Sequence, residues 1–213
     1  MAAPHTDGRI ARGNQTRELI LRRTVDIASV EGLDGLSLGR LATELKLSKS
    51  GVFALFGSKE NLQLATVRTA VARYTQHVVR PAEELPPGIA RLWRLCTAWQ
   101  AYSRDRVFPG DCFFYAVSAE YDAREGQVHD VLATVRARWS AYVEETVRGA
   151  RAAGELAEET DVPQLAFEIA ALLELANAES VLHDEFGSYD KAAKGIHQRL
   201  RAAATDPVLL PER

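Results

Sequence analysis

One short stretch, LKLSKSGVFALF, which spans Leu45–Phe56, decides the fold. At 100° per residue, a helix that begins after Ser48 places Val52, Leu55 and Phe56 on its inner side. Its outer side then carries Lys49, Ser50 and Phe53. The stretch therefore predicts a short helix with a small polar face that a protein core does not need.

Two further short helices are predicted before this stretch. Residues 16–31 form the first, whose apolar stripe ends where Gly32 can close the helix in a left-handed cap. Ser37 is a good N-cap for the second, in which apolar residues follow the spacing i, i+3, i+4, i+7. Ser48 and Ser58 can cap the third and fourth helices in the same way. Two short helices joined by a tight turn, the second with an uncovered polar face, predict a helix-turn-helix.

The rest of the chain is also predicted to be helical. Apolar residues recur at spacings of three and four, and no alternating β-branched segment occurs. The fourth helix is expected to run to Pro81, where the segment PAEELPPG breaks the pattern. Further helices are expected at residues 88–104, 111–122, 127–153, 162–184 and 189–204. The predicted fold class is all-α, with about nine helices.

Four parts are expected along the chain. They are a flexible N-terminal arm (residues 1–15), a helix-turn-helix domain (16–62), a C-terminal helical domain for ligand binding and dimerisation (63–205) and a polar tail (206–213). Residues 1–60 hold nine Lys and Arg against seven Asp and Glu, whereas residues 61–213 hold 17 against 22. This asymmetry favours an anionic partner for the N-terminal part, although the net charge of the whole chain is −3.

Composition excludes several classes of protein. With 46% hydrophobic and 26% charged residues the chain is globular, and no apolar run approaches the ~20 residues that span a bilayer. The N-terminus lacks the apolar segment of a secretory signal. The two cysteines, Cys96 and Cys112, match neither a zinc site nor a CxxC redox motif. Buried thiols in a reducing cytoplasm, and no membrane partner, are therefore expected.

Residues 16–62, TRELILRRTVDIASVEGLDGLSLGRLATELKLSKSGVFALFGSKENL, resemble the DNA-binding domain of the TetR family of transcriptional regulators. The resemblance begins with the Arg-x-x-Ile-Leu opening at Arg17 and with Glu31-Gly32. It continues through Leu36-Ser37, Leu41-Ala42, Leu47-Ser48-Lys49, the segment FGSKE at residues 56–60, and Leu62. It covers about 47 consecutive positions, with helices, caps and turns in the family's order. The remaining residues match the family in architecture only.

The resemblance implies that the third helix enters the major groove and that Lys59 contacts a phosphate. The open amides at the starts of the second and fourth helices, at Ser37 and Ser58, are also suited to phosphates. Lys49 can reach a base edge or a phosphate, and Phe53 can pack on a thymine methyl or a sugar. The candidate DNA-binding residues are Ser37, Lys46, Ser48, Lys49, Ser50, Gly51, Phe53 and Lys59.

Three positions depart from the family's pattern. The family's turn commonly has glycine where Lys46 stands, so a left-handed backbone there would strain this residue while adding a cation. A tyrosine is common where Phe53 stands, and a histidine or similar polar residue where Leu55 stands. These departures concern the set of DNA contacts and not the presence of the domain.

The resemblance also implies that the C-terminal part binds a small-molecule effector. Aromatic residues concentrate in the helices expected there and can line an apolar pocket with polar tips. Aromatic residues at helical spacing are also typical of an ordinary core, and that alternative stays open. The candidate ligand-binding residues are Trp93, Cys96, Trp99, Tyr102, Phe113, Trp139, Tyr142, Phe167 and Asn177.

A homodimer is the second expectation for the C-terminal part. The helix expected at residues 162–184 is apolar around much of its circumference and therefore needs two partners, one of which we expect to be a second subunit. With the helix that follows, it would form a four-helix interface. The candidate interface residues are Leu165, Ile169, Leu172, Leu173, Ala176, Ala192, Ile196 and Leu200.

The sequence therefore predicts a ligand-responsive regulator that binds double-stranded operator DNA, most often a repressor in this family. No paired carboxylates, nucleophile elbow, phosphate loop or HExxH motif is present, so we expect no catalytic residue, no metal and no cofactor. The alternative is a DNA-binding or protein-interaction module of the same fold without an effector.

Overall fold

The computed structural model describes residues 5–110 and 112–211, with side chains from residue 11 onward. These residues form helices and connecting turns, and among them no strand occurs beyond an isolated bridge between Leu156 and Ala204. The predicted all-α class is confirmed. The helices are α1 (His5–Glu31), α2 (Leu38–Glu44), α3 (Lys49–Phe56), α4 (Lys59–Tyr74), η1 (Thr75–Val79), α5 (Arg80–Glu83), α6 (Ile89–Arg104), α7 (Phe113–Tyr121), α8 (Gln127–Ala152), α9 (Val162–His183), α10 (Gly187–Ala203) and η2 (Pro207–Leu209).

Helix α1 begins at His5, well before the predicted start at residue 16. The prediction of a flexible arm is thus corrected to helix for residues 5–15, while residues 1–4 lie outside the described part. Extending an existing helix adds one hydrogen bond for each residue fixed, without a second nucleation, so a polar segment can continue a helix that packing stabilises elsewhere. The other end is as predicted, because Gly32 follows α1 with a φ of 76°.

The fourth helix continues past the predicted end. A π-helical segment, η1, joins α4 to α5, and Pro81 lies within α5. Proline has no amide hydrogen to donate, and the widened π-helical turn that comes before it already interrupts the regular i to i−4 bonding. The helical run therefore continues to Glu83 before the PPG segment ends it.

The chain divides into two compact units. The N-terminal unit comprises the described residues up to Val71 together with Phe108–Leu132, and the C-terminal unit comprises Ala72–Val107 and the described residues from Ala133. This division differs from the predicted boundary at residue 62, because α4 runs across it and α7 joins the N-terminal unit.

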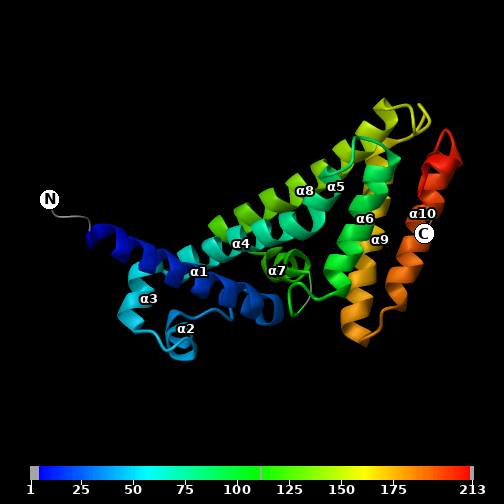
Figure 1. The fold of residues 1–213 in the computed structure, drawn as a ribbon. Helices are drawn as coiled ribbons and strands as arrows, with labels where there is room; N and C mark the ends of the chain where they lie inside the picture. The colour runs from blue at the N-terminus through cyan, green and yellow to red at the C-terminus, as the bar shows by residue number, and fades with distance from the viewer. Residues whose placement is uncertain (1–4, 111, 212–213) are drawn as a thin grey trace. The chain divides into compact units, whose positions relative to one another are not determined.

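Helix α7 joins the N-terminal unit through close contact with α1 (Figure 1). The amide of Gly110 donates to Ser29 Oγ at 3.1 Å. A Cβ at position 110 would lie only 2.1 Å from the carbonyl oxygen of Ser29, so only glycine permits this approach. The segment before α7 is thereby fixed against the end of α1.

The C-terminal unit is built around α6, α9 and α10, which lie side by side (Figure 1). Its core contains a buried polar link in addition to apolar side chains. Ser103 Oγ donates to Asn177 Oδ1 at 2.5 Å and lies 2.7 Å from the hydroxyl of Tyr189. Because these three residues come from α6, α9 and α10 respectively, the link fixes how the three helices are aligned.

Candidate nucleic-acid interface and effector region

The helix-turn-helix is held by the serine caps that the sequence predicts. Ser48 Oγ accepts from the amide of Gly51 at 3.1 Å, and Ser58 Oγ accepts from Asn61 at the same distance. Ser37 Oγ accepts from Arg40 at 3.4 Å. Each cap satisfies one amide. The other amides of a first turn have no acceptor within the helix and can therefore bind a phosphate.

The turn between α2 and α3 places Lys46 in the left-handed region, with a φ of 54°. The amide of Leu47 donates to the carbonyl of Ala42 at 2.8 Å, and that of Lys46 donates to Thr43 at 3.2 Å. This pair of bonds is the Schellman motif, whose left-handed position glycine normally occupies. Lys46 is fully part of the turn and holds an exposed cation beside α3.

Replacing Lys46 with glycine is expected to stabilise the protein by up to about 1 kcal/mol, because glycine adopts a positive φ without the steric cost that lysine bears. Urea denaturation at neutral pH measures the difference. The control is Ala54→Gly on the exposed side of α3, which should destabilise by about 1 kcal/mol. Equal destabilisation by both variants would contradict the interpretation.

The outer side of α3 is exposed, and its inner side is buried. Val52 is 1% exposed and Phe56 6%, and the guanidinium of Arg17 lies 5.3 Å from the centre of the Phe56 ring. Leu55, expected on the inner side, is only half-buried. Phe53 is 57% exposed, which is unusual for a large aromatic side chain. The other exposed candidates around it are Ser48, Lys49, Ser50 and Gly51.

The cations near this face fall into two groups. Arg40 forms ion pairs with Glu31 and Glu44, and Arg23 binds the same Glu44. Hydrogen bonds from Arg40 hold the pKa values of both carboxyl groups below their usual range. Lys46 and Lys49, by contrast, form no ion pair within the described part of the chain. Their charges are available to an outside anion.

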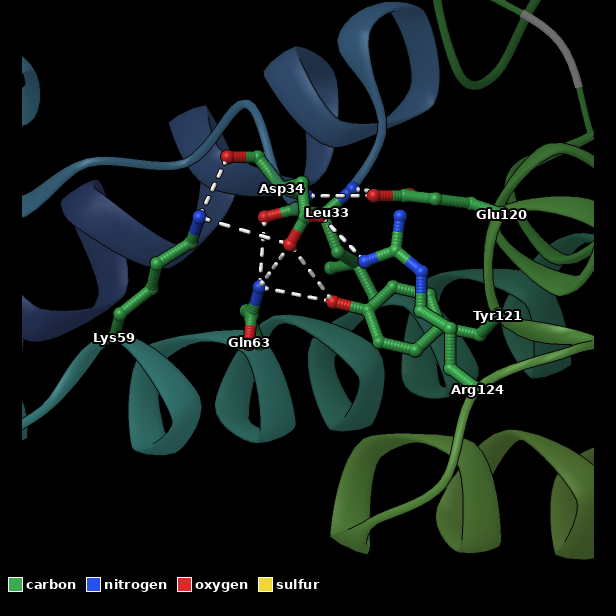
Figure 2. A network of polar contacts seen from close by, with 7 residues as sticks. All are labelled: Leu33, Asp34, Lys59, Gln63, Glu120, Tyr121 and Arg124. Carbon is green, nitrogen blue, oxygen red and sulfur yellow. Dashed lines mark hydrogen bonds and ion pairs between the residues drawn. The ribbon is translucent and has the colours of Figure 1, made fainter.

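Lys59, the predicted phosphate contact, is held by Asp34 (Figure 2). Its ammonium group donates to the carbonyl of Asp34 at 2.7 Å and lies 3.6 Å from the carboxylate. The same carboxylate binds Arg124, and the hydroxyl of Tyr121 donates to it at 3.2 Å. The side chain of Lys59 remains 47% exposed, so it can still reach outward from the start of α4.

The residues around Asp34 shift one another's pKa values. The hydrogen bond from Arg124 holds the pKa of Asp34 below its ordinary value of 3.8, with a smaller contribution from Lys59. Partial burial, together with the charges of Asp34 and Glu120, raises the pKa of Tyr121 to about 12. Tyr121 is therefore a neutral donor, and Asp34 is a carboxylate, at physiological pH.

Because the pKa of Asp34 is lower in the folded state, its contribution to stability is present above pH 3.8 and is lost as the pH falls below that value. Asp34→Asn is therefore expected to be less stable than the wild type at pH 7, and the difference should shrink near pH 3.5. The group is half-exposed, so the difference should be about 1 kcal/mol or less. Urea denaturation at both pH values measures it, and a difference independent of pH would contradict it.

Four of the predicted ligand-binding residues come together in the C-terminal unit. Trp99 lies 6.2 Å from Tyr102, and Trp139 lies 6.3 Å from Tyr142, both measured between ring centres. Tyr74, which the sequence interpretation did not select, joins these pairs, because its ring is 5.2 Å from Tyr102 and 5.3 Å from Trp139. We call these five residues the aromatic cluster. Arg91 adds a donor at 3.3 Å from the hydroxyl of Tyr142.

The other five predicted ligand-binding residues differ from these four in their contacts or exposure. Trp93 packs against the ring of His197 at 5.2 Å, and Asn177 belongs to the buried polar link. Cys96 is buried, which raises the pKa of its thiol to about 12. Phe113 belongs to the N-terminal unit, where it packs on Phe108, because α7 joins that unit. Phe167 is 71% exposed, so it lines no enclosed pocket in a single chain.

The predicted interface residues are mostly buried inside a single chain. On α9 these are Leu165, Ile169, Leu173 and Ala176, and on α10 they are Ala192, Ile196 and Leu200, all at most 3% exposed. They serve the packing of α9 and α10 against each other and against α6, so they offer no surface to a second copy. Leu172 is only half-buried, and it lies beside Gly195 of α10.

A different side of α9 is apolar and exposed. Phe167, Leu175 and Leu182 are 71%, 59% and 77% exposed. At 100° per residue these three positions lie within about 80° of one another on the helix, with Ala171 and Ala178 between them. We call these five residues the α9 stripe. Such a row on one helix is typical of a surface that another helix covers.

Residues 88–196 match the family model described as "Tetracyclin repressor-like, C-terminal domain", which covers more than half of the 213 residues. The chain belongs to the tetracycline repressor-like (TetR) family. No curated protein matches the sequence significantly.

Solved structures of TetR-family regulators share the fold. A regulator from Chloroflexus aurantiacus is 20% identical, with a TM-score of 0.84 over 91% of this chain and 98% of its own. The regulator CifR, solved with a 26-base-pair operator duplex, is 23% identical, with a TM-score of 0.71 over 87% of this chain and 96% of its own. AibR, solved with isovaleryl coenzyme A and operator DNA, is 15% identical, with a TM-score of 0.65 over 87% of this chain and 96% of its own.

Within the described residues, no helix is long and apolar enough to cross a membrane. The same residues contain no group of three or more His, Cys, Asp or Glu side chains placed to hold a metal ion.

Sequence reasoning missed the partners of Asp34. Glu120, Tyr121 and Arg124 lie about ninety positions away along the chain and show no motif, although Figure 2 places them around one turn. The sequence signals at this turn, Gly32 and Ser37, mark the end of α1 and the start of α2 but say nothing of the helix that packs there.

Proposed function

We propose that the chain is a ligand-responsive, operator-binding transcriptional regulator. It acts in the cytoplasm as a repressor, and a small apolar or aromatic effector releases it from palindromic DNA. The observation that carries the proposal is the outer side of α3, where Lys49, Ser50 and Phe53 are exposed beside the capped starts of α2 and α4. Two proteins of the same fold, CifR and AibR, were solved with operator DNA.

A dimer fixes how the two α3 helices are placed along the DNA duplex. Two copies related by a two-fold axis present two α3 helices to one side of the duplex, so the operator is a palindrome with half-sites about 34–36 Å apart or slightly more. We assign the α9 stripe as the surface that joins the two copies, in place of the buried residues that the sequence favoured.

The cations of this surface are expected to show in the salt dependence of DNA binding. Lys49→Ala should weaken binding to a duplex of random sequence and reduce the slope of log K against log salt by about 0.9, because one phosphate contact is lost. Fluorescence anisotropy between about 50 and 200 mM salt measures this slope. The matched control is Lys194→Ala on α10, an exposed lysine of the other unit, which should change neither value. Identical behaviour of both variants would contradict the proposed surface.

The effector site is assigned to the aromatic cluster in the C-terminal unit. Its rings supply apolar contact area, and the hydroxyl of Tyr142 with the nearby Arg91 supplies a polar end. AibR, which shares the fold, was solved with isovaleryl coenzyme A. An effector that prefers one dimer geometry over the other by about 1–3 kcal/mol is sufficient to change operator occupancy.

A second function, DNA binding without an effector, is favoured by one observation. The rings of the aromatic cluster already pack against one another, as in an ordinary core. Tyr74 meets Tyr102 and Trp139 edge to face, and Trp139 stacks on Tyr142. A thermal-shift screen of apolar and aromatic compounds separates the two functions, since a ligand raises the melting temperature by mass action. A compound that stabilises the wild type but not Trp99→Ala or Tyr142→Ala supports the regulator. Unchanged binding to both variants overturns the assigned site.

A further inference from the structure

The turn between α1 and α2 is bound from two sides (Figure 2). On one side, the amides of Leu33 and Asp34 donate to the two oxygens of Glu120 at 2.7 and 2.8 Å. On the other side, the carbonyls of the same two residues accept from Gln63 at 3.0 Å and from Lys59 at 2.7 Å. A segment of the helix-turn-helix is thus fixed between the start of α4 and the end of α7.

The carboxylate of Asp34 is shared between two cations from different elements. Lys59 stands at the start of α4, and Arg124 follows the end of α7. Arg124 lies 4.7 Å from the centre of the Tyr121 ring, and the hydroxyl of Tyr121 reaches the same carboxylate. Gln63 approaches this carboxylate as well, at 3.4 Å. The cationic side chain of Arg124 is therefore positioned by both the ring and the anion.

The balance of charge at Asp34 depends on Arg124. With both cations present, Asp34, Lys59 and Arg124 carry a net charge of +1, while the carboxylate of Glu120 is held by the amides of Leu33 and Asp34. Lys59 then keeps a charge that an outside anion can use. Without Arg124, the carboxylate faces Lys59 alone, and the net charge of the pair is zero. Two unit charges about 4 Å apart interact by about 1 kcal/mol even when the solvent screens them as strongly as bulk water does, so the loss of one cation changes the electrostatic energy of the other two groups.

Arg124 is also connected to the C-terminal unit through the backbone. The segment Phe108–Leu132 belongs to the N-terminal unit by packing, but both of its ends continue into the C-terminal unit. Besides this segment, the chain crosses between the units only within α4, among the described residues. The two cations that share Asp34 therefore stand on the two connections between the units.

We propose that Arg124 is a positioning residue for DNA binding, which acts by neutralising Asp34 and so leaves the charge of Lys59 to a DNA phosphate. When Arg124 no longer binds Asp34, the carboxylate of Asp34 competes with the DNA phosphate for the ammonium group of Lys59. The inference rests on the proposed function and deepens it, because it names a contact through which the segment that contains α7 controls affinity for DNA.

The test is a set of variants that bind a duplex of random sequence. Arg124→Gln is expected to weaken binding about fivefold at low salt, because the charge of Lys59 is then taken up by Asp34. Adding Asp34→Asn to this variant removes the competing anion and should restore wild-type affinity. Arg124→Lys, which keeps the charge, should bind like the wild type. Thermal melting of each variant confirms that it is folded.

A double-mutant cycle separates this role from direct contact. In a Lys59→Gln background, Arg124→Gln should have no further effect, because no ammonium group remains to be released. Additive losses would show that Arg124 itself binds phosphate, and a loss that Asp34→Asn does not restore would show a purely structural role. Either result overturns this inference alone. Failure of the wild type to bind the duplex would overturn the proposed function together with it.

Discussion

Leu175→Glu is expected to convert a dimer of this protein into monomers. The side chain is 59% exposed in the single chain and lies in the middle of the α9 stripe, so a carboxylate there would be buried twice in a symmetric interface. A central interface residue contributes about 2–4 kcal/mol, so the dimer dissociation constant should rise at least about 30-fold. Sedimentation velocity over a range of protein concentrations measures it.

Two control variants test whether the α9 stripe is the interface. Val208→Glu, at a side chain that is 87% exposed and outside the stripe, should leave the dimer intact. Leu173→Glu, at a side chain that is 1% exposed, should unfold the protein and not simply separate the subunits. A folded monomer from Leu173→Glu, with an intact dimer from Leu175→Glu, would return the interface to the residues that the sequence favoured.

Gly110→Ala is expected to destabilise the N-terminal unit by about 3 kcal/mol or more, because the new methyl group meets backbone and not a flexible side chain. The added Cβ would lie 2.1 Å from the carbonyl oxygen of Ser29 and 2.8 Å from Val30 Cα. Relief requires that the segment before α7 move away from α1, which also removes the bond from the Gly110 amide to Ser29. Thermal and urea denaturation measure the loss.

The matched control for this prediction is Gly13→Ala in α1, where the new methyl group meets no atom within 4 Å apart from the neighbouring residues and backbone of its own helix. Alanine favours a helix more than glycine does, so this variant should be neutral or more stable by up to about 1 kcal/mol. The clash at position 110 is absent if Gly110→Ala melts at the wild-type temperature. In that case, α7 does not depend on this contact for its place in the unit.

Most helix positions in this protein could be read from the sequence, because they depend on neighbours within one turn. The caps at Ser37, Ser48 and Ser58 and the left-handed end at Gly32 are set by residues three or four positions apart. The inner and outer sides of α3 follow from the same periodicity, with Leu55 as the half-buried exception. The start of α1 did not follow, since a polar segment shows no apolar period.

The sequence alone determined the all-α class, the helix-turn-helix and the polar face on α3, because local spacing and capping specify them. Only the tertiary structure decided which side of α9 faces outward, since a helix that is apolar around its circumference has no period that separates a core side from an exposed one. It also decided that α7 joins the N-terminal unit and brings Glu120 and Arg124 to the turn at Asp34. Those contacts depend on how distant helices pack, which spacing along the chain does not encode.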